Sequence, residues 1–209
     1  MSIYIACILR CRRCFDRTRK VHSVAWGTIG RIRLRLSPPD SLSFFFLLSQ
    51  GPYDGIIGFS QGGAMASGMI GLQERGLALT GIPALRCLVA IGSFRAGAAH
   101  FAPAFQGGPL SCPALFFTGD SDRLVKPSET LALAASFAGS TVVPHPGGHE
   151  VPILTGSAAE DADRRDTVRA FFEERLAEKL VASAREKIAK GRAAQIAIAQ
   201  PVLPVDPPV

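Results

Sequence analysis

One five-residue stretch, GFSQG at residues 58–62, constrains the fold of this chain more than any other. It places a serine between two glycines, directly after the apolar run of residues 54–59 and before a run of small residues. A serine in this setting projects above a sheet on a sharp turn between a strand and a helix, where flanking side chains would collide with the turn. The pattern therefore predicts a strand, a tight turn and a helix, with Ser60 as a candidate nucleophile.

The same turn offers a group that stabilises negative charge. Backbone N–H groups in the first turn of a helix have no acceptor within the helix, and they favour anions. If the helix starts directly after Ser60, the amide of Gln61 points at the oxyanion that forms when a serine attacks an acyl carbon. Gln61 is therefore the candidate oxyanion donor.

Two later loops supply an acid and a histidine. The apolar run at residues 113–117 leads into a turn with Asp120 and Asp122, and the run at residues 140–143 leads into the stretch HPGGH at residues 145–149. Loops that follow parallel strands meet at the carboxyl edge of a sheet. We therefore expect a carboxylate and an imidazole to meet the serine there, in the chain order nucleophile, acid, histidine.

The segment from about Gly51 to Pro152 resembles the fungal FSH-type serine hydrolases, a branch of the α/β-hydrolase superfamily. The resemblance rests on four stretches, GPYDGIIGFSQGGAMA, LVAIGSFR, FFTGDSDRLV and HPGGHEVP. The stretch GFSQGGA is also similar to the acyl-protein thioesterase and carboxylesterase group, but the HPGGH ending favours the FSH type.

The resemblance implies an α/β fold with a mostly parallel sheet and flanking helices. It makes Ser60 the nucleophile, Asp122 the orienting acid and His149 the general base. The family pattern of Gly, two residues, Asp, two residues, Val favours Asp122 over Asp120, and the Gly-Gly pair before His149 favours that residue over His145. The implied reaction is hydrolysis of a small-molecule carboxylic ester or thioester through an acyl-enzyme, with no metal or organic cofactor.

Residues 1–50 do not match this family. They hold nine Lys or Arg against two Asp or Glu, whereas residues 51–209 hold fourteen against fifteen. Because the basic character is local, we do not expect the body of the protein to bind nucleic acid. The family starts with an apolar strand that runs into a His-Gly-type loop with a second oxyanion amide, and the sequence has no such loop. We therefore expect the first strand and this loop to be missing or distorted, and an alternative function is a catalytically impaired hydrolase-like binding protein.

The origin of residues 1–50 has three competing interpretations. The stretch SFFFLLSQ at residues 43–50 is what the pyrimidine-rich end of an unspliced intron would encode, which indicates a gene-model error. The excess of arginine is typical of a mitochondrial presequence. The spacing of Cys7, Cys11 and Cys14 resembles the cluster-binding loop of radical SAM enzymes.

The odd cysteine count suggests no disulfide framework, so we expect a cytoplasmic protein, or a mitochondrial one if residues 1–50 are native.

Length and composition agree with one domain over residues 51–198, since 47% hydrophobic and 19% charged residues are typical of a globular chain. No apolar run reaches the roughly 18 residues of a membrane span. We expect strands near residues 54–59, 86–92, 113–118 and 140–144, and helices near residues 61–75, 127–137 and 158–198. The loop at residues 94–112 forms either part of the rim over the site or a plain surface connection.

In the last helix, six apolar residues recur at helical spacing and are expected to face the core: Val168, Phe171, Phe172, Leu176, Leu180 and Val181. Residues 199–209 are proline-rich and are expected to be disordered.

Overall fold

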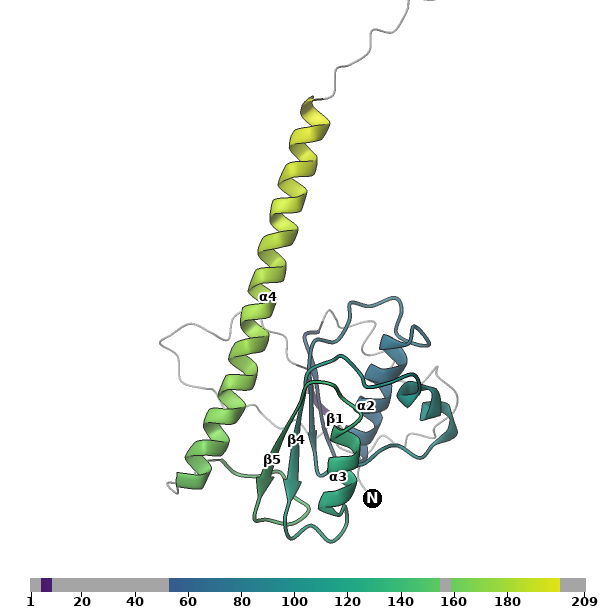
Figure 1. Cartoon of the computed structure of the whole chain (residues 1–209), viewed down its shortest axis with the longest axis vertical. Coiled ribbons are helices and arrows are strands. Elements are labelled where there is room, and N and C mark those ends of the chain that lie inside the picture. The colour runs from purple at the N-terminus through teal and green to yellow at the C-terminus, as the bar shows by residue number, and fades with distance from the viewer. Residues whose placement is uncertain (1–4, 9–52, 155–158, 200–209) are drawn as a thin grey trace, which may run out of the picture. The chain divides into compact units, whose positions relative to one another are not determined.

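The computed structural model describes residues 5–8, 53–154 and 159–199 (Figure 1). The chain divides into two compact units, Met1–Thr167 and Val168–Val209. Most of the basic segment at residues 1–50, including Cys11, Cys14 and the stretch at residues 43–50, lies outside the described residues. The proline-rich tail beyond residue 199 does so too.

The first unit is built on a five-stranded sheet in the order β1-β2-β3-β4-β5 (Figure 1). Its strands are β1 (Ile5–Ile8), β2 (Ile56–Phe59), β3 (Leu88–Ile91), β4 (Ala114–Gly119) and β5 (Ser140–His145). The pairs from β2 to β5 are parallel, which confirms the predicted α/β class with a mostly parallel sheet. The carboxyl ends of these four strands therefore share one edge of the sheet.

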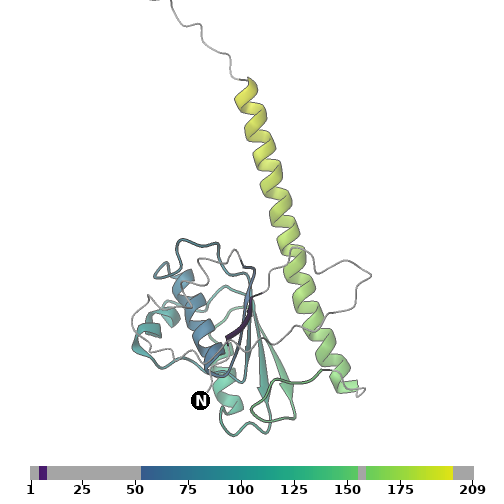
Figure 2. The same cartoon turned by 180° about the vertical axis from the view of Figure 1, so that it is seen from behind.

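The edge strand β1 pairs antiparallel with β2, with an irregular register between Ile5 and Ile8. It is the purple strand in Figure 2. β1 is thus a short antiparallel strand beside β2, the strand that directly precedes Ser60. The segment after β1, where the first strand and the His-Gly-type loop were expected to be missing or distorted, lies outside the described residues.

The connections between the parallel strands include α2 (Gln61–Glu74), the 3-10 helix η1 (Ala99–Phe105) and α3 (Pro127–Ala134). The sheet advances by one strand at every step from β2 to β5, so right-handed crossovers place α2 and α3 on the same face. The strands and helices predicted from the sequence in this region agree with these elements to within a few residues.

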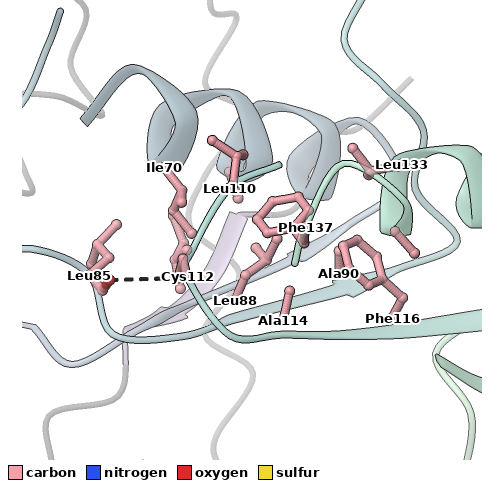
Figure 3. Packing of buried hydrophobic residues seen from close by; sticks show 13 residues of the cluster. Ile70, Leu85, Leu88, Ala90, Leu110, Cys112, Ala114, Phe116, Leu133 and Phe137 are labelled. Atoms are coloured by element: carbon pink, nitrogen blue, oxygen red, sulfur yellow. Dashed lines mark hydrogen bonds between the residues drawn. The ribbon is translucent and has the colours of Figure 1, made fainter. Parts of the chain in front are cut away.

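The main core lies between this face of the sheet and the two helices (Figure 3). Leu88 and Phe116 from the strands meet Ile70 from α2 and Leu133 from α3, and all four are at most 1% exposed. The ring of Phe137 packs edge-on against Phe116, with 5.4 Å between centroids. Every residue of β3 and β4 is buried, which is typical of strands in a sheet covered on both faces.

The loop at residues 94–112 contains a packed turn. Phe101 and Ala104 of η1 are buried, and they lie against the glycines at positions 68 and 71 of α2. A Cβ atom on Gly68 would overlap the Phe101 ring, and one on Gly71 would lie 2.6 Å from the Ala104 carbonyl oxygen. The small residues of α2 allow this close approach.

The last helix, α4 (Ala159–Ala199), was predicted within a residue at each end. Of its six expected core residues, Phe171 is buried, whereas Leu180 and Val181 are 62% and 49% exposed. The assignment of these two residues to the core was therefore wrong. Helical spacing shows which residues share a face, but it does not show how far along the helix that face is covered. Within the described part of the chain, no helix combines the length and the apolar character needed to cross a membrane.

Candidate active site

The predicted nucleophile lies on the turn between β2 and α2. Ser60 directly follows the last residue of β2 and directly precedes the first residue of α2. Its backbone has φ 55° and ψ −124°, a conformation that costs a non-glycine residue about 1–3 kcal/mol. The strained turn predicted from the GFSQG pattern is therefore present, and Gln61 is the first residue of the helix, as expected.

Gly58 is required by the close approach of strand and helix. A Cβ atom at this position would lie 2.5 Å from the carbonyl group of Gly62 and from the backbone nitrogen of Gly63. These contacts are to backbone, so a side chain can be accommodated only by moving the turn itself. The flanking glycine thus has the steric role predicted from the sequence.

The acid is supplied by the loop after β4. The side chain of Asp122 is 1% exposed, and its Oδ1 accepts hydrogen bonds from the backbone N–H groups of Leu124 and Val125, each at 2.9 Å. Burial alone raises the pKa of the Asp122 carboxyl, but these N–H groups stabilise its ionised form. Together with the contact to His149 they hold the pKa below its ordinary value of 3.8. Asp122 is thus a buried carboxylate.

The imidazole of His149 connects the acid to the serine. Its Nδ1 lies 2.8 Å from Oδ2 of Asp122, and its Nε2 lies 2.8 Å from Oγ of Ser60. Because the carboxylate is only an acceptor, Nδ1 must carry the proton in the neutral ring. Nε2 then presents a lone pair to the serine hydroxyl. The structure therefore brings together the three residues that the sequence singled out.

The rival residues lie elsewhere. Asp120 is exposed, and its backbone N–H donates to the carbonyl oxygen of His145. His145 is the last residue of β5 and is 4% exposed. Burial lowers the pKa of the His145 imidazole below its ordinary value of 6.5. The described contacts to the Ser60 hydroxyl and to the Asp122 carboxylate come from His149, not His145.

Two residues beside the imidazole had no role in the sequence analysis. The ring of Phe59 lies against His149, with 4.7 Å between centroids and 36° between planes. Gly92, at φ 49°, leaves room for the same ring, because a Cβ there would lie 3.2 Å from its Nδ1. Phe59 is the variable residue of the G-x-S-x-G pattern, and Gly92 lies within the LVAIGSFR stretch, so neither contact could be read from spacing.

Within the described residues, no group of three or more His, Cys, Asp or Glu side chains is arranged to hold a metal ion. The two cysteines of this region, Cys87 and Cys112, are buried and free of disulfides.

Comparison with known proteins gives a family match. The family model described as serine hydrolase (FSH1) matches residues 36–160 and so begins upstream of Gly51. Human esterase OVCA2 is 34% identical over 102 residues, which cover 49% of this chain and 44% of the relative. The family of serine hydrolases 2 protein of Saccharomyces cerevisiae is 33% identical over 117 residues, covering 53% of this chain and 52% of that protein.

Among solved structures, acyl-protein thioesterase 2 of Zea mays is similar at 18% identity with a TM-score of 0.44, over 64% of this chain and 62% of that one. The chain spans about half the length of the curated relatives named above.

Proposed function

The chain belongs to the serine hydrolase (FSH1) family, and from that premise we propose that it cleaves carboxylic ester or thioester bonds of small molecules by acyl transfer from Ser60 to water. One observation supports this proposal above the others: a single imidazole lies 2.8 Å both from the Ser60 hydroxyl and from the buried Asp122 carboxylate. Serine, histidine and acid in this order of contact form the arrangement that activates a serine hydroxyl.

In the first half-reaction, Oγ of Ser60 forms a bond to the acyl carbon while its proton moves to Nε2 of His149. The carbonyl oxygen of the substrate becomes an oxyanion, which accepts a hydrogen bond from the backbone N–H of Gln61. When this intermediate collapses, the bond to the leaving oxygen or sulfur breaks. The leaving group takes the proton from Nε2 and departs as an alcohol or thiol.

In the second half-reaction, water attacks the acyl-enzyme and gives a proton to Nε2 of His149. The bond between the acyl carbon and Oγ of Ser60 then breaks, the proton returns to Oγ, and the carboxylic acid leaves. Throughout the cycle the Asp122 carboxylate keeps the proton on Nδ1 and stabilises the imidazolium.

The test measures hydrolysis of p-nitrophenyl esters and acyl thioesters by the parent, Ser60→Ala and Ser140→Ala. Ser140 is an exposed serine at the amino end of β5, the end of the sheet away from the site, so it controls for a generic serine substitution. We expect Ser60→Ala to lose turnover and the control to retain it. Equal rates for the parent and Ser60→Ala would show that another group performs the reaction.

A fluorophosphonate probe separates this proposal from a catalytically inert binding protein. The probe forms a covalent bond only with an activated serine, so we expect it to label Ser60, as mapped by mass spectrometry of peptides. A folded parent that stays unlabelled would favour the inert fold.

The expected cytoplasmic location remains a prediction, and imaging a fluorescent fusion of the full chain tests it.

A further inference from the structure

The backbone of Ser60 is held in its strained conformation by a small set of hydrogen bonds. Its N–H donates to the carbonyl oxygen of Ile91 at 2.8 Å. Its own carbonyl oxygen accepts from the backbone N–H groups of Gly63 and Ala64, each at 3.1 Å. Since φ 55° and ψ −124° are unfavourable for serine, the surrounding contacts must fix the position of Oγ.

A buried hydroxyl lies at the centre of these contacts. Ser93 follows β3 and is 0% exposed, and its Oγ lies 3.2 Å from the carbonyl oxygen of Ser60 and 3.0 Å from that of Ile91. The carbonyl of Ser60 belongs to the strained residue, and the carbonyl of Ile91 accepts the Ser60 N–H. The hydroxyl of Ser93 therefore contacts two of the backbone groups that fix the conformation of Ser60.

The neighbouring positions are shaped around this hydroxyl. A Cβ atom on Gly63 would overlap Oγ of Ser93, so glycine at position 63 makes space for it. The backbone of Ser93 is fixed in turn, because the hydroxyl of Thr130 in α3 donates to its carbonyl oxygen at 2.8 Å. Thr130 is also 0% exposed. The hydrogen bonds thus run from α3 through the end of β3 to the turn at Ser60, and the two residues whose hydroxyls donate them, Thr130 and Ser93, are buried.

We propose that Ser93 is a positioning residue that holds the backbone of Ser60 so that its hydroxyl meets His149. The expected effect of Ser93 on the rate of hydrolysis rests on the proposed function, whereas its expected effect on the turn at Ser60 rests on the structure alone. Buried hydrogen bonds contribute order and stability most when water has no access to replace them. Removing the Ser93 hydroxyl leaves the side chains of Ser60, His149 and Asp122 unchanged, but it loosens the turn that positions Ser60.

The test compares Ser93→Ala with Ser67→Ala. Ser67 is a matched control because it is also 0% exposed and its hydroxyl also donates to a backbone carbonyl, that of Gly63, without contacting Ser60. We expect kcat for a p-nitrophenyl ester to fall about tenfold in Ser93→Ala with KM within about twofold, and kcat in Ser67→Ala to stay within about twofold of the parent. A purely structural role would lower thermal stability in both variants and leave kcat of the folded protein similar in the two.

Hydrogen exchange gives a readout that does not depend on activity. Peptides that cover residues 60–64 should exchange faster in Ser93→Ala than in Ser67→Ala, because the N–H groups of Gly63 and Ala64 donate to the loosened carbonyl. Equal exchange in the two variants, or equal kcat, would overturn the role of Ser93. If the parent fails to hydrolyse esters, the proposed function fails, and the exchange comparison still decides whether Ser93 holds the turn.

Discussion

Replacing Asp122 by asparagine should remove catalysis and leave the fold nearly intact. Oδ1 of Asp122 accepts hydrogen bonds from the backbone N–H groups of Leu124 and Val125. In Asp122→Asn the amide oxygen takes this place, because an NH₂ group there would face two other donors. The NH₂ group then points at His149, whose Nδ1 must become an acceptor. The imidazole proton moves to Nε2, which no longer accepts the proton of Ser60.

We expect kcat to fall by about 10⁴ in Asp122→Asn through this change of tautomer. Asp122→Ala should have a second effect, because it leaves the buried N–H of Val125 without its acceptor, which costs about 1–3 kcal/mol. At about 2–4 °C for each kcal/mol in a chain of this size, the alanine variant should unfold at a visibly lower temperature than the asparagine variant. The two substitutions thus separate the acid's effect on the imidazole from its effect on the loop.

The assay is ester hydrolysis together with thermal unfolding of the parent, both Asp122 variants and Asp120→Asn. Asp120 is exposed and lies two residues earlier in the same loop, so Asp120→Asn removes a similar charge without touching His149. We expect this control to keep kcat within about twofold. This role of the Asp122 carboxylate would be contradicted if folded Asp122→Asn kept more than a tenth of the parent's kcat, or if Asp120→Asn lost as much kcat as Asp122→Asn.

Two further predictions concern the turn and the pH dependence of stability. Gly58→Ala should disrupt the turn between β2 and α2, because its methyl group would lie 2.5 Å from backbone atoms of Gly62 and Gly63. A variant with the parent's melting temperature and probe labelling would contradict this. His145 has a folded-state pKa below 6.5, so on acidification the unfolded chain binds a proton there before the folded chain does, and stability falls as the pH drops below about 6.5. Urea midpoints at pH 7.5 and 5.5 should therefore differ less in His145→Gln than in the parent, and an unchanged difference would show that His145 contributes nothing to it.

The parts of the site that the sequence predicted are those whose chemistry is local. The GFSQG pattern predicts the turn by itself, because only glycine at position 58 leaves room for the backbone of residues 62 and 63 to approach so closely. The loops with Asp122 and His149 each follow a strand directly, and the end of a parallel strand fixes which edge of the sheet a loop reaches. The choice between Asp120 and Asp122 came from resemblance to a family pattern, not from physical reasoning about the loop.

The parts that were not predicted depend on contacts between distant segments. Residues 5–8 are apolar, but nothing in four residues shows that they pair antiparallel with β2. Leu180 and Val181 have the spacing of core residues, but burial depends on what covers a helix and not on its periodicity. Phe59 and Gly92 lie beside the imidazole only because β2 and β3 are neighbours in register, with Phe59 opposite Ile91.

The turn at Ser60 depends both on its local sequence and on contacts with distant segments. Gly58 allows the close approach of β2 and α2 around Ser60, since a side chain there would collide with the backbone, but the lack of a collision does not by itself stabilise one conformation over others. Stability must come from partners of the Ser60 backbone, and those on β3 and after it are Ile91 and Ser93, the latter 33 residues away. A chain with the glycines but without these partners would have the same five-residue pattern and a looser nucleophile. The pattern therefore identifies where a serine can be activated, and the hydrogen bonds of the Ser60 backbone with Ile91 and Ser93 determine how precisely its hydroxyl is positioned.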